Sequence, residues 1–410
     1  MSEPGPVDVA VFVPGLDSGG GAEKTALVTA RALADAGLTV TCFTDSRVSP
    51  GHLREHFGVD MGNVQLEQLP SPRVHRRLPR AVRDLVRDVA HVKAMRARVP
   101  GLFINMKFKS ELPGIGDRSW YYTHFPHVLH LPTRSGAHAF YLRLVAAARH
   151  RLLLRGASRF IDTYEVVLAN SEFTREHVHR RWNVDAITLH PPCAQLTGAA
   201  AADRAKTILN VGRFQADGPN IPHKRQDVLV QTLADMPDLA ADGWSLHLVG
   251  AVGTSAADRA YLEHVRTMAH GLPVSLHPNA SHELLSELSA HARLYWHAQG
   301  YGTDSDRHPE AQEHFGISTV EAMSAGIVPL VYATAGPAEV VQDEPDLTWR
   351  TPAELAAKTR ALLDPERWTS WHERCRRRAE EFSTDAFSGC LRELYASRVG
   401  PLPAHRRGGG

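Results

Sequence analysis

Two carboxylates that could serve a reaction, Glu313 and Glu321, lie eight positions apart in residues 308–341, HPEAQEHFGISTVEAMSAGIVPLVYATAGPAEVV. Carboxylate oxygens accept hydrogen bonds from hydroxyl groups, and Gly316 between them lets a ligand come close to the backbone. A helix that begins in this stretch would offer free N–H groups and a positive dipole end to a phosphate. The stretch therefore indicates a ligand with both hydroxyls and phosphate, and a nucleotide sugar is such a ligand.

The local pattern places these residues on a loop, a helix and a strand. Ser318 with Glu321 forms a capping-box pattern, which predicts a helix that begins near Ser318 and ends near Gly326. The apolar run Val328–Tyr332 predicts a short strand. Glu313 would then lie in the loop before the helix, and Glu321 in its first turn. Two plainer interpretations stay open here, a capping role for Glu321 and a solvated loop position for Glu313.

The composition limits the class of protein. A chain of 410 residues predicts two domains of about 200 residues each. The chain is 43% hydrophobic and 22% charged with a formal net charge of +1, which is typical of a soluble protein and does not favour nucleic acid as a partner. Four scattered cysteines without a CxxC pair favour a reducing compartment, and the 24 histidines show no metal-ligand spacing. We expect no signal peptide, and no apolar run reaches the ~18–20 residues of a membrane span, so we expect a cytoplasmic protein.

The first half has the pattern of a doubly wound α/β domain. Its opening predicts a buried parallel strand, a glycine loop, a helix and a second strand, over residues 7–13, 14–21, 22–36 and 38–43. The loop ends in Gly20 and Gly21 without a G-x-G-x-x-G spacing, so it is either a phosphate contact or a flexible turn. His124 stands at the end of an aromatic strand over residues 120–126, where it is either functional or structural.

Residues 73–98 are rich in arginine and carry an apolar stripe at helical spacing. One interpretation is an amphipathic helix that packs on the first domain with its arginines in solvent. The other is a surface that contacts an anionic membrane or a phosphorylated acceptor. Asp84 and Asp88 dilute the positive charge, which favours the first interpretation.

The second half repeats the alternation of strands and helices. A strand over residues 207–211 is followed by Gly212 and Arg213, and Lys224 precedes a helix over residues 226–236. Low-complexity residues 198–202 are the best candidate for a domain boundary. Two facing α/β domains hold a ligand in the cleft between them. The expected parts are an N-terminal domain, a C-terminal domain, a helix that crosses back to the N-terminal domain and a disordered tail, over residues 1–202, 203–383, 384–400 and 401–410.

Together, the glycine loop, the Gly-Arg-Phe turn and the E-x7-E stretch resemble the retaining glycosyltransferases of family 4, which have the GT-B fold of two facing Rossmann-like domains. The resemblance runs from about residue 7 to about residue 395, and its specific part is the FGI core between the two glutamates. The segments EHFGISTVEAMSAG, NSEFT and HPPC are most similar to the GDP-mannose-dependent mannosyltransferases that extend lipid-linked oligosaccharides, and to bacterial relatives. The resemblance implies that the N-terminal domain binds the acceptor and the C-terminal domain binds the nucleotide sugar.

The resemblance also implies roles for individual residues. Arg213 and Lys224 match the basic pair that holds the donor diphosphate, which agrees with the need to stabilise a departing phosphate. Glu313 matches the glutamate that binds the donor sugar, and Glu321 matches the one that binds the ribose. His124 matches a histidine near the reaction centre. The donor-binding matches in the glycine loop and in the FGI core are Gly20, Gly21, Phe315, Gly316 and Ile317.

The sequence departs from the family pattern at three places, one of which is the loop over residues 335–337, where a single glycine stands instead of the two that are frequent near the phosphate. The spacing from Arg213 to Lys224 is long, so Arg225 competes with Lys224 for the phosphate role. Asp304 and Asp306 form a D-x-D sequence, which is the metal signature of another glycosyltransferase fold, and we interpret it as coincidence. The resemblance implies no metal and no cofactor.

The hypothesis from the sequence is a retaining hexosyltransferase with GDP-mannose as the best single donor. Two alternatives stay open: a transferase of the same fold that uses UDP-glucose or UDP-N-acetylglucosamine, and a nucleotide-sugar-binding protein without turnover. The missing G-x-G-x-x-G disfavours a dehydrogenase. The expected partners are the nucleotide-sugar donor, an unidentified hydroxyl acceptor (a small molecule, glycan or glycolipid) and, peripherally, the inner face of a membrane.

Overall fold

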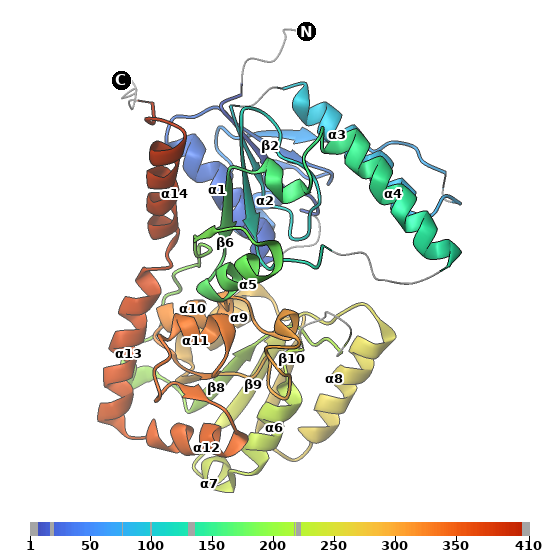
Figure 1. Ribbon diagram of the computed structural model, residues 1–410. Coiled ribbons are helices and arrows are strands. Elements are labelled where there is room, and N and C mark those ends of the chain that lie inside the picture. The colour runs from blue at the N-terminus through green and yellow to red at the C-terminus, as the bar shows by residue number, and fades with distance from the viewer. Residues whose placement is uncertain are drawn as a thin grey trace. The chain divides into compact units, whose positions relative to one another are not determined.

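The chain forms two compact units. The computed structural model describes residues 7–16, 20–75, 77–98, 101–129, 136–216, 218 and 223–403, and Figure 1 shows their helices and strands. The first unit contains the chain up to Pro191 together with the chain from Phe387 onward, and the second unit is Pro192–Ala386. The second unit therefore interrupts the first unit in the sequence.

The first unit is built on a seven-stranded parallel sheet in the order β3-β2-β1-β4-β5-β6-β7. Its central strands are short apolar runs buried on both faces, as expected where helices cover both sides of a parallel sheet. The strands are β1 (Val9–Phe12), β2 (Val40–Thr44), β3 (Gln65–Gln68), β4 (Leu102–Asn105), β5 (Arg118–Thr123), β6 (Val166–Ala169) and β7 (Ala186–Thr188).

Alternate residues of each strand serve two separate cores in this unit. Val9 and Val11 of β1 face one core, and Ala10 and Phe12 face the other. The first core is completed by α1 (Gly21–Asp35), α2 (Pro50–Phe57) and α14 (Thr384–Arg398), and the second by α3 (Arg80–Arg96), α4 (Ala137–Leu153), η1 (Phe160–Thr163) and α5 (Glu172–Trp182).

The second unit has a six-stranded parallel sheet in the order β10-β9-β8-β11-β12-β13. Its strands are β8 (Thr207–Val211), β9 (Ser245–Gly250), β10 (Val274–Pro278), β11 (Leu294–His297), β12 (Val328–Tyr332) and β13 (Thr348–Trp349). Its helices are η2 (Ala201–Asp203), α6 (Gln226–Ala234), α7 (Pro237–Ala241), α8 (Ala256–Met268), α9 (His282–His291), η3 (Pro309–Ala311), α10 (Ile317–Ser324), α11 (Ala335–Val340), α12 (Pro352–Ala361) and α13 (Pro365–Glu380).

Each sheet changes its winding direction at one pair of neighbouring strands. In the first unit this switch point lies between β1 and β4, and in the second between β8 and β11. Loops at the carboxyl ends of such strand pairs diverge and leave a crevice in which doubly wound proteins bind ligands. The two switch points are therefore the places where the functional residues of each unit are expected.

Residues 198–202, where the sequence placed the domain boundary, pack within the second unit. The Ala199 N–H donates to the Ala290 carbonyl at 2.9 Å. A Cβ on Gly198 would lie 1.8 Å from the Ala325 carbonyl oxygen, so glycine is required at this close approach. The second unit begins earlier, after Pro191. The small side chains that suggested a linker serve close packing instead.

The C-terminal helix α14 contributes to the core of the first unit. Phe387, Leu391 and Tyr395 are buried in the same cluster as Val9 and Val11 of β1. The predicted tail begins at residue 401, and its residues 404–410 lie outside the described part of the chain.

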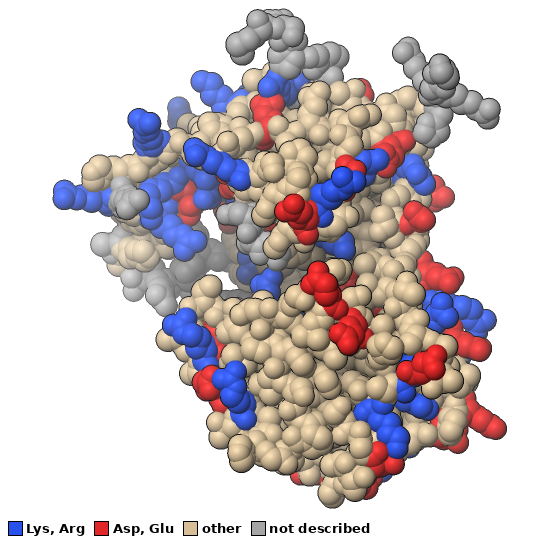
Figure 2. All heavy atoms as spheres, turned by 180° about the vertical axis from the view of Figure 1, so that it is seen from behind, with Lys and Arg blue, Asp and Glu red and all other residues tan. Residues whose placement is uncertain are grey.

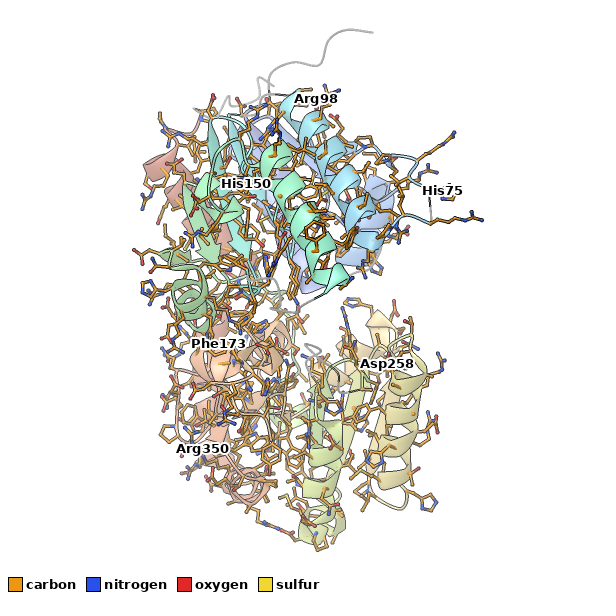
Figure 3. All side chains as sticks on the ribbon, turned by 45° about the vertical axis from the view of Figure 1, so that its right-hand side comes forward. His75, Arg98, His150, Phe173, Asp258 and Arg350 are labelled. Carbon is orange, nitrogen blue, oxygen red and sulfur yellow. The ribbon has the colours of Figure 1, made fainter. Side chains whose placement is uncertain are left out.

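Helices α3 and α4 lie side by side on the first unit, as Figures 1 and 3 show; Figure 3 labels His150 on α4. The predicted basic helix is α3, although Arg76 lies outside the described residues. Viewed from behind, Lys and Arg side chains gather on this side of the unit (Figure 2). Among the described helices, none combines the length and the apolar character that crossing a membrane requires.

Candidate functional site

The predicted site residues of the second unit gather at the switch point of its sheet. Gly212 and Arg213 follow β8, His297 ends the neighbouring strand β11, and Glu313 lies in the loop that precedes α10. Lys224 lies just before α6 and reaches back to this edge. The loop positions come from distant parts of the sequence, and the sheet brings them together.

A pair of glycines places Lys224. A Cβ on Gly212 would lie 2.9 Å from Lys224 Cγ, and a Cβ on Gly250 would lie 2.0 Å from the Gly212 carbonyl oxygen. The loop after β8 therefore lies flat against β9, and the aliphatic part of Lys224 lies across Gly212. Any larger side chain at Gly212 would displace the lysine.

Gln226 holds the same loop in place through hydrogen bonds, and the sequence did not predict this role. This fully buried side chain donates from Nε2 to the carbonyls of Gly212 (3.1 Å) and Arg213 (3.2 Å). Its Oε1 accepts from the Tyr261 hydroxyl at 3.0 Å. Farther along the loop, Asp258 on α8, labelled in Figure 3, accepts from the Ala216 N–H at 3.0 Å. A glutamine at the start of a helix is ordinary in sequence, so nothing marked this one.

Changing Gln226 to leucine should lower the free energy of unfolding by about 1–3 kcal/mol, because two partly buried carbonyls lose their hydrogen bonds and the Tyr261 hydroxyl keeps only Asp227 as a partner. Chemical denaturation followed by tryptophan fluorescence measures the change. Gln231 on the same helix is exposed and pairs with Asp235, so Gln231→Leu is the matched control and should change stability little. Equal effects of the two substitutions would contradict the role of Gln226.

Lys224 and Glu313 form an ion pair at the centre of this edge. The Lys224 ammonium donates to Glu313 Oε2, and each side chain is about one-fifth exposed, 22% and 21%. Burial acts to raise the pKa of Glu313, but the Lys224 ammonium and, where they are protonated, the neighbouring histidines outweigh it, so the net pKa is lowered. Glu313 is therefore a carboxylate at neutral pH and accepts hydrogen bonds.

His297 lies next to this pair at the end of β11, and the sequence analysis did not select it. Its side chain is 4% exposed, and neither ring nitrogen has a hydrogen-bond partner among the described residues. Burial lowers the pKa of His297 to about 4, although Glu313 acts in the opposite direction. The ring is therefore neutral near pH 7. The polar end of the LYWH strand was the one signal that could have identified it.

The loop that carries Glu313 is held by α11. The Gly336 N–H donates to the Glu313 carbonyl at 3.1 Å, and a Cβ on Gly336 would lie 2.2 Å from the Phe315 Cα atom. Phe315 is buried and packs edge-on against Phe382, with ring centroids 5.4 Å apart. Backbone contact on one side and an aromatic anchor on the other fix the position of Glu313.

The predicted capping box at the start of this helix is wrong. Helix α10 begins at Ile317, and its N-cap is Gly316 in the left-handed region with φ 97°. Ser318 lies inside the first turn and its hydroxyl pairs with the buried Tyr295 hydroxyl at 2.9 Å. Glu321 is the fifth residue of the helix and lies in its second turn. Among the described residues no side chain caps α10, so the N–H groups at its start are not taken up by a capping side chain.

The two arginines near Lys224 differ in their surroundings. Arg213 is exposed, and its guanidinium has no ion pair or hydrogen bond to a residue that the structure describes. Arg225 takes a left-handed backbone conformation, pairs with Asp227 at 3.3 Å and lies over the Tyr301 ring at 5.9 Å. The structure therefore brings Lys224, and not Arg225, to Glu313.

The D-x-D sequence forms a turn of its own. Asp304 Oδ1 accepts from the N–H groups of Asp306 (2.9 Å) and Arg307 (3.2 Å), and Oδ2 lies 3.5 Å from Arg307 Nε. Its carboxylate is used within the loop. In the described part of the chain, no group of three or more His, Cys, Asp or Glu side chains is arranged to hold a metal ion.

The remaining predicted residues belong to the first unit. Gly20 is the N-cap of α1 with an extended backbone, and Gly21 is the first helical residue; Gly19 lies outside the described residues. His124 follows β5, is 7% exposed, and stacks on Phe108 with ring centroids 5.7 Å apart. These residues lie at the carboxyl edge of the first sheet, as Lys224 and Glu313 do in the second.

Most of the second unit matches a family of known proteins. Residues 198–382 match the family described as "Glycosyl transferases group 1". Two curated relatives are named GDP-Man:Man(3)GlcNAc(2)-PP-Dol alpha-1,2-mannosyltransferase. The one from Candida glabrata is 26% identical over 194 residues, which is 44% of this chain and 34% of the relative. The one from Dictyostelium discoideum is 26% identical over 247 residues, which is 55% of this chain and 45% of the relative. The matched regions thus span less than half the length of these relatives.

Solved structures match over nearly the whole chain. A glycosyltransferase from Rickettsia africae has a TM-score of 0.63 at 13% identity, and covers 96% of this chain and 98% of that one. Sucrose-phosphate synthase from Thermosynechococcus elongatus has a TM-score of 0.64 at 18% identity, with 95% and 98% covered. HepE from Anabaena, solved with UDP and glucose, has a TM-score of 0.64 at 14% identity, with 95% and 100% covered. The predicted fold class, two Rossmann-like α/β domains of the GT-B type, is confirmed.

Proposed function

Because residues 198–382 form a glycosyl transferases group 1 domain, we propose that the protein is a retaining glycosyltransferase. It moves a hexosyl group from a nucleotide-diphosphate sugar to a hydroxyl acceptor. The observation that carries the proposal is the Lys224–Glu313 pair at the switch point of the second unit. It places a cation for phosphate beside a carboxylate for sugar hydroxyls. The names of the curated relatives favour GDP-mannose as the donor.

Donor binding would rearrange the ion pair. A diphosphate carries more negative charge than one carboxylate, so the Lys224 ammonium would leave Glu313 for the phosphate oxygens. Arg213, which has no partner in the described part of the unit, and the uncapped start of α10 would hold the same diphosphate. The Glu313 carboxylate would then accept from the sugar hydroxyls, and Glu321 from the ribose.

The transfer itself would proceed on one face of the sugar. The acceptor oxygen forms a bond to the anomeric carbon on the side from which the diphosphate leaves, and the bond from that carbon to the phosphate oxygen breaks. The departing phosphate oxygen takes the acceptor proton. Because the new bond forms on the face that the diphosphate leaves, the configuration is retained. Lys224 and Arg213 offset the charge on the leaving group without a metal ion or another cofactor. The roles of Gly20 and Gly21 at the diphosphate and of His124 near the reaction centre stay predictions from the resemblance.

GDP should raise the melting temperature of the protein more than UDP, ADP or TDP in a thermal-shift panel. A nucleotide at about 100 times its dissociation constant stabilises the folded state by about 2.7 kcal/mol. Turnover of GDP-mannose, measured as the release of GDP, then distinguishes a transferase from a binding protein without turnover. A preference for UDP would replace the donor with a UDP-sugar, and no response to any nucleotide would contradict the proposed site.

We also propose that the protein works in the cytoplasm, peripherally on an anionic membrane face. The free cysteines of the described chain, three of them buried, support a reducing compartment. Helix α4 contains no Asp or Glu, and it exposes Phe140, Leu144 and Leu152 beside its arginines. Exposed apolar side chains among cations are the features of a helix that rests on anionic lipid.

Changing Arg80, Arg83, Arg143 and Arg151 to serine should weaken binding to vesicles that contain phosphatidylserine. Each cation near such a surface contributes about 1 kcal/mol, so the combined loss should be roughly two to three orders of magnitude. Vesicle co-sedimentation at low salt measures it. Arg259 and Arg266 on α8 supply the control pair. Unaltered sedimentation of the four-arginine variant would remove the membrane from the proposal.

A further inference from the structure

The loop after β4 in the first unit is rigid. Asn105 donates from Nδ2 to the Ser110 hydroxyl (2.9 Å) and to the Tyr164 hydroxyl (2.8 Å), and its Oδ1 accepts from the Lys107 N–H (3.1 Å). The Ser110 N–H donates to the Tyr121 hydroxyl at 3.3 Å. Asn105, Ser110 and Tyr121 are all buried. The loop therefore presents residues 107–109 from a fixed base at the switch point between β1 and β4.

Phe108 forms an exposed aromatic surface on this loop. It is 41% exposed, and its ring stacks on His124 with an interplanar angle of 21°. His124 is itself held edge-on by Tyr122, with ring centroids 5.1 Å apart. An exposed phenylalanine supported on its other face is preorganised for stacking, because little conformational entropy is lost when a flat apolar ligand binds.

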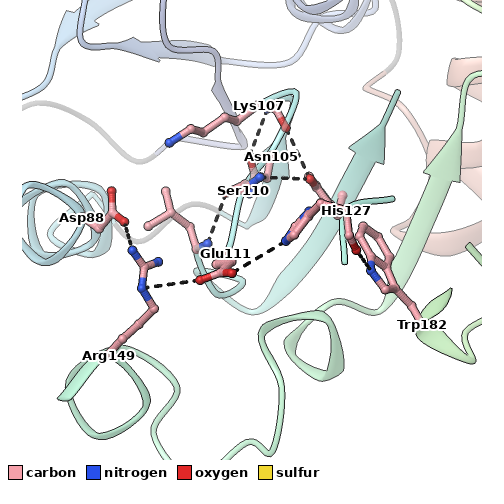
Figure 4. Close-up of polar contacts among 10 residues, drawn as sticks. Asp88, Asn105, Lys107, Ser110, Glu111, His127, Arg149 and Trp182 are labelled. Atoms are coloured by element: carbon pink, nitrogen blue, oxygen red, sulfur yellow. Dashed lines mark hydrogen bonds and ion pairs between the residues drawn. The ribbon is translucent and has the colours of Figure 1, made fainter. Parts of the chain in front are cut away.

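Lys107, the preceding residue, belongs to a group of charges at the same edge. Burial lowers the pKa of Lys107, and the charges of Asp88 and Asp45 partly offset this effect. Its ammonium has no ion pair or hydrogen bond within the described chain. Asp45 follows β2 and accepts from the Gly15 N–H at 3.0 Å. Figure 4 shows Lys107 reaching from the loop toward α3, which carries Asp88.

Helices α3 and α4 add charged side chains of both signs to this group. Arg149 lies 2.6 Å from Asp88 and 3.6 Å from Glu111, and Glu111 lies 3.9 Å from His127 (Figure 4). Arg87 also lies 3.6 Å from Asp88, and the Lys109 ammonium lies 5.8 Å from the Phe108 ring centroid, so the cations and carboxylates of the group nearly balance. The buried Asp88 Oδ1 and the Nε2 atom of His91, a residue only 2% exposed, have no hydrogen-bond partner among the described residues. Asp88 Oδ1 is the atom near the Arg87 guanidinium, so the group offers a ligand polar atoms but little net charge.

We propose that the loop of Lys107 and Phe108 is a subsite for a neutral sugar ring of the acceptor. Phe108 stacks against the apolar C–H face of the ring, and Lys107 and Asp45 exchange hydrogen bonds with its hydroxyls. The inference deepens the proposed function, on which it rests, by naming the acceptor as a carbohydrate and placing its recognition in the first unit.

The chemistry of the group favours a sugar over a phosphate. A phosphate would have to displace the carboxylates Asp45, Asp88 and Glu111 or accept their repulsion. A polyhydroxylated ligand binds to side chains of both charges, because each hydroxyl donates to a carboxylate and accepts from an ammonium. The aromatic surface adds a contact that a phosphate cannot use.

Saturation-transfer NMR on the full chain, without nucleotide, tests the subsite with methyl α-mannopyranoside and methyl β-glucopyranoside as probes. At least one sugar should give signals from its ring protons. Lys107→Met and Phe108→Ala should each weaken binding about tenfold, as expected for one hydrogen bond to a charged group or one stacking contact. Phe108→Trp should keep the signal. Leu78→Ala, which removes an apolar side chain as exposed as Phe108 from the segment before α3, is the matched control.

Three results would overturn the subsite: no signal from either sugar, signals unchanged in both Lys107→Met and Phe108→Ala, or displacement of the sugar by inorganic phosphate. The outcome is independent of the donor site, because no nucleotide is present. Sugar binding that depends on Phe108 without any nucleotide-induced shift in melting temperature would keep this inference and reject the glycosyltransferase proposal. A GDP-induced shift in melting temperature without sugar binding would keep the glycosyltransferase proposal and reject this inference.

Discussion

Lys224→Ala should lower kcat for glycosyl transfer from GDP-mannose about 10²- to 10³-fold, which is the loss expected when one charged donor to a developing anion is removed. The side chain lies across Gly212 and reaches Glu313, so alanine leaves no cation in its place. Release of GDP under saturating donor measures kcat. The loss should exceed that of any other single cation at this site, because the Lys224 side chain is only 22% exposed and its phosphate contact would be poorly screened.

Lys206→Ala supplies the control for this experiment. Lys206 is an exposed lysine of the same unit, and it pairs with Asp242 at 2.7 Å on the surface. Its removal should leave kcat within a factor of two or so, since exposed pairs contribute about 0–1 kcal/mol and this one lies before β8, at the opposite end of the strand from the site. Full activity of Lys224→Ala would remove Lys224 from the catalytic residues and reopen the question of Arg225.

His297 should make the protein sensitive to acid. The pKa of this histidine is about 4 in the folded chain and 6.5 in the unfolded chain, so between these values the unfolded state binds the proton and the folded state does not. Stability is therefore present in full above pH 6.5 and is lost as the pH falls toward 4. The loss from this one residue amounts to about 3 kcal/mol.

Comparison with His297→Gln isolates this effect. Burial also lowers the pKa of other histidines, which add to acid sensitivity in both proteins: His91, His127, His177, His247, His277 and His372. Denaturant unfolding of wild type and variant between pH 4 and 8 should give curves that converge as the pH falls. Curves that stay parallel would show that His297 titrates normally, with water at the ring nitrogens.

Much of the fold could be predicted from the sequence because buried parallel strands leave a strong local signal. The run Val328–Tyr332 is the strand β12, and Thr207–Val211 is β8, with the bounds that their apolar residues suggested. The start of α10 could not be predicted in the same way. Ser318 satisfies its hydroxyl with Tyr295, a residue 23 positions away, and local capping rules contain no information on such a partner.

The residues of the candidate site likewise include some that the sequence predicted and some that it did not. Glu313 and Lys224 were selected from motif spacing, and the structure places them in contact, while their catalytic roles stay predictions. Gln226 was not selected, and Gly336 stood out only as a departure from the family pattern. Gln226 matters because it reaches two carbonyls across the β8 loop, and Gly336 because the backbone at Phe315 passes within van der Waals distance. Both effects arise from the packing of distant segments, which composition and periodicity do not record.

The return of the chain into the first unit determines the order in which the protein can fold during synthesis. The second unit enters and leaves at adjacent points, since the Cys193 N–H donates to the Phe382 carbonyl at 2.9 Å. It is a continuous segment, and it can fold once residue 386 has left the ribosome. The first unit must wait for Phe387, Leu391 and Tyr395 to complete its core. The half of the protein that is made first therefore matures last.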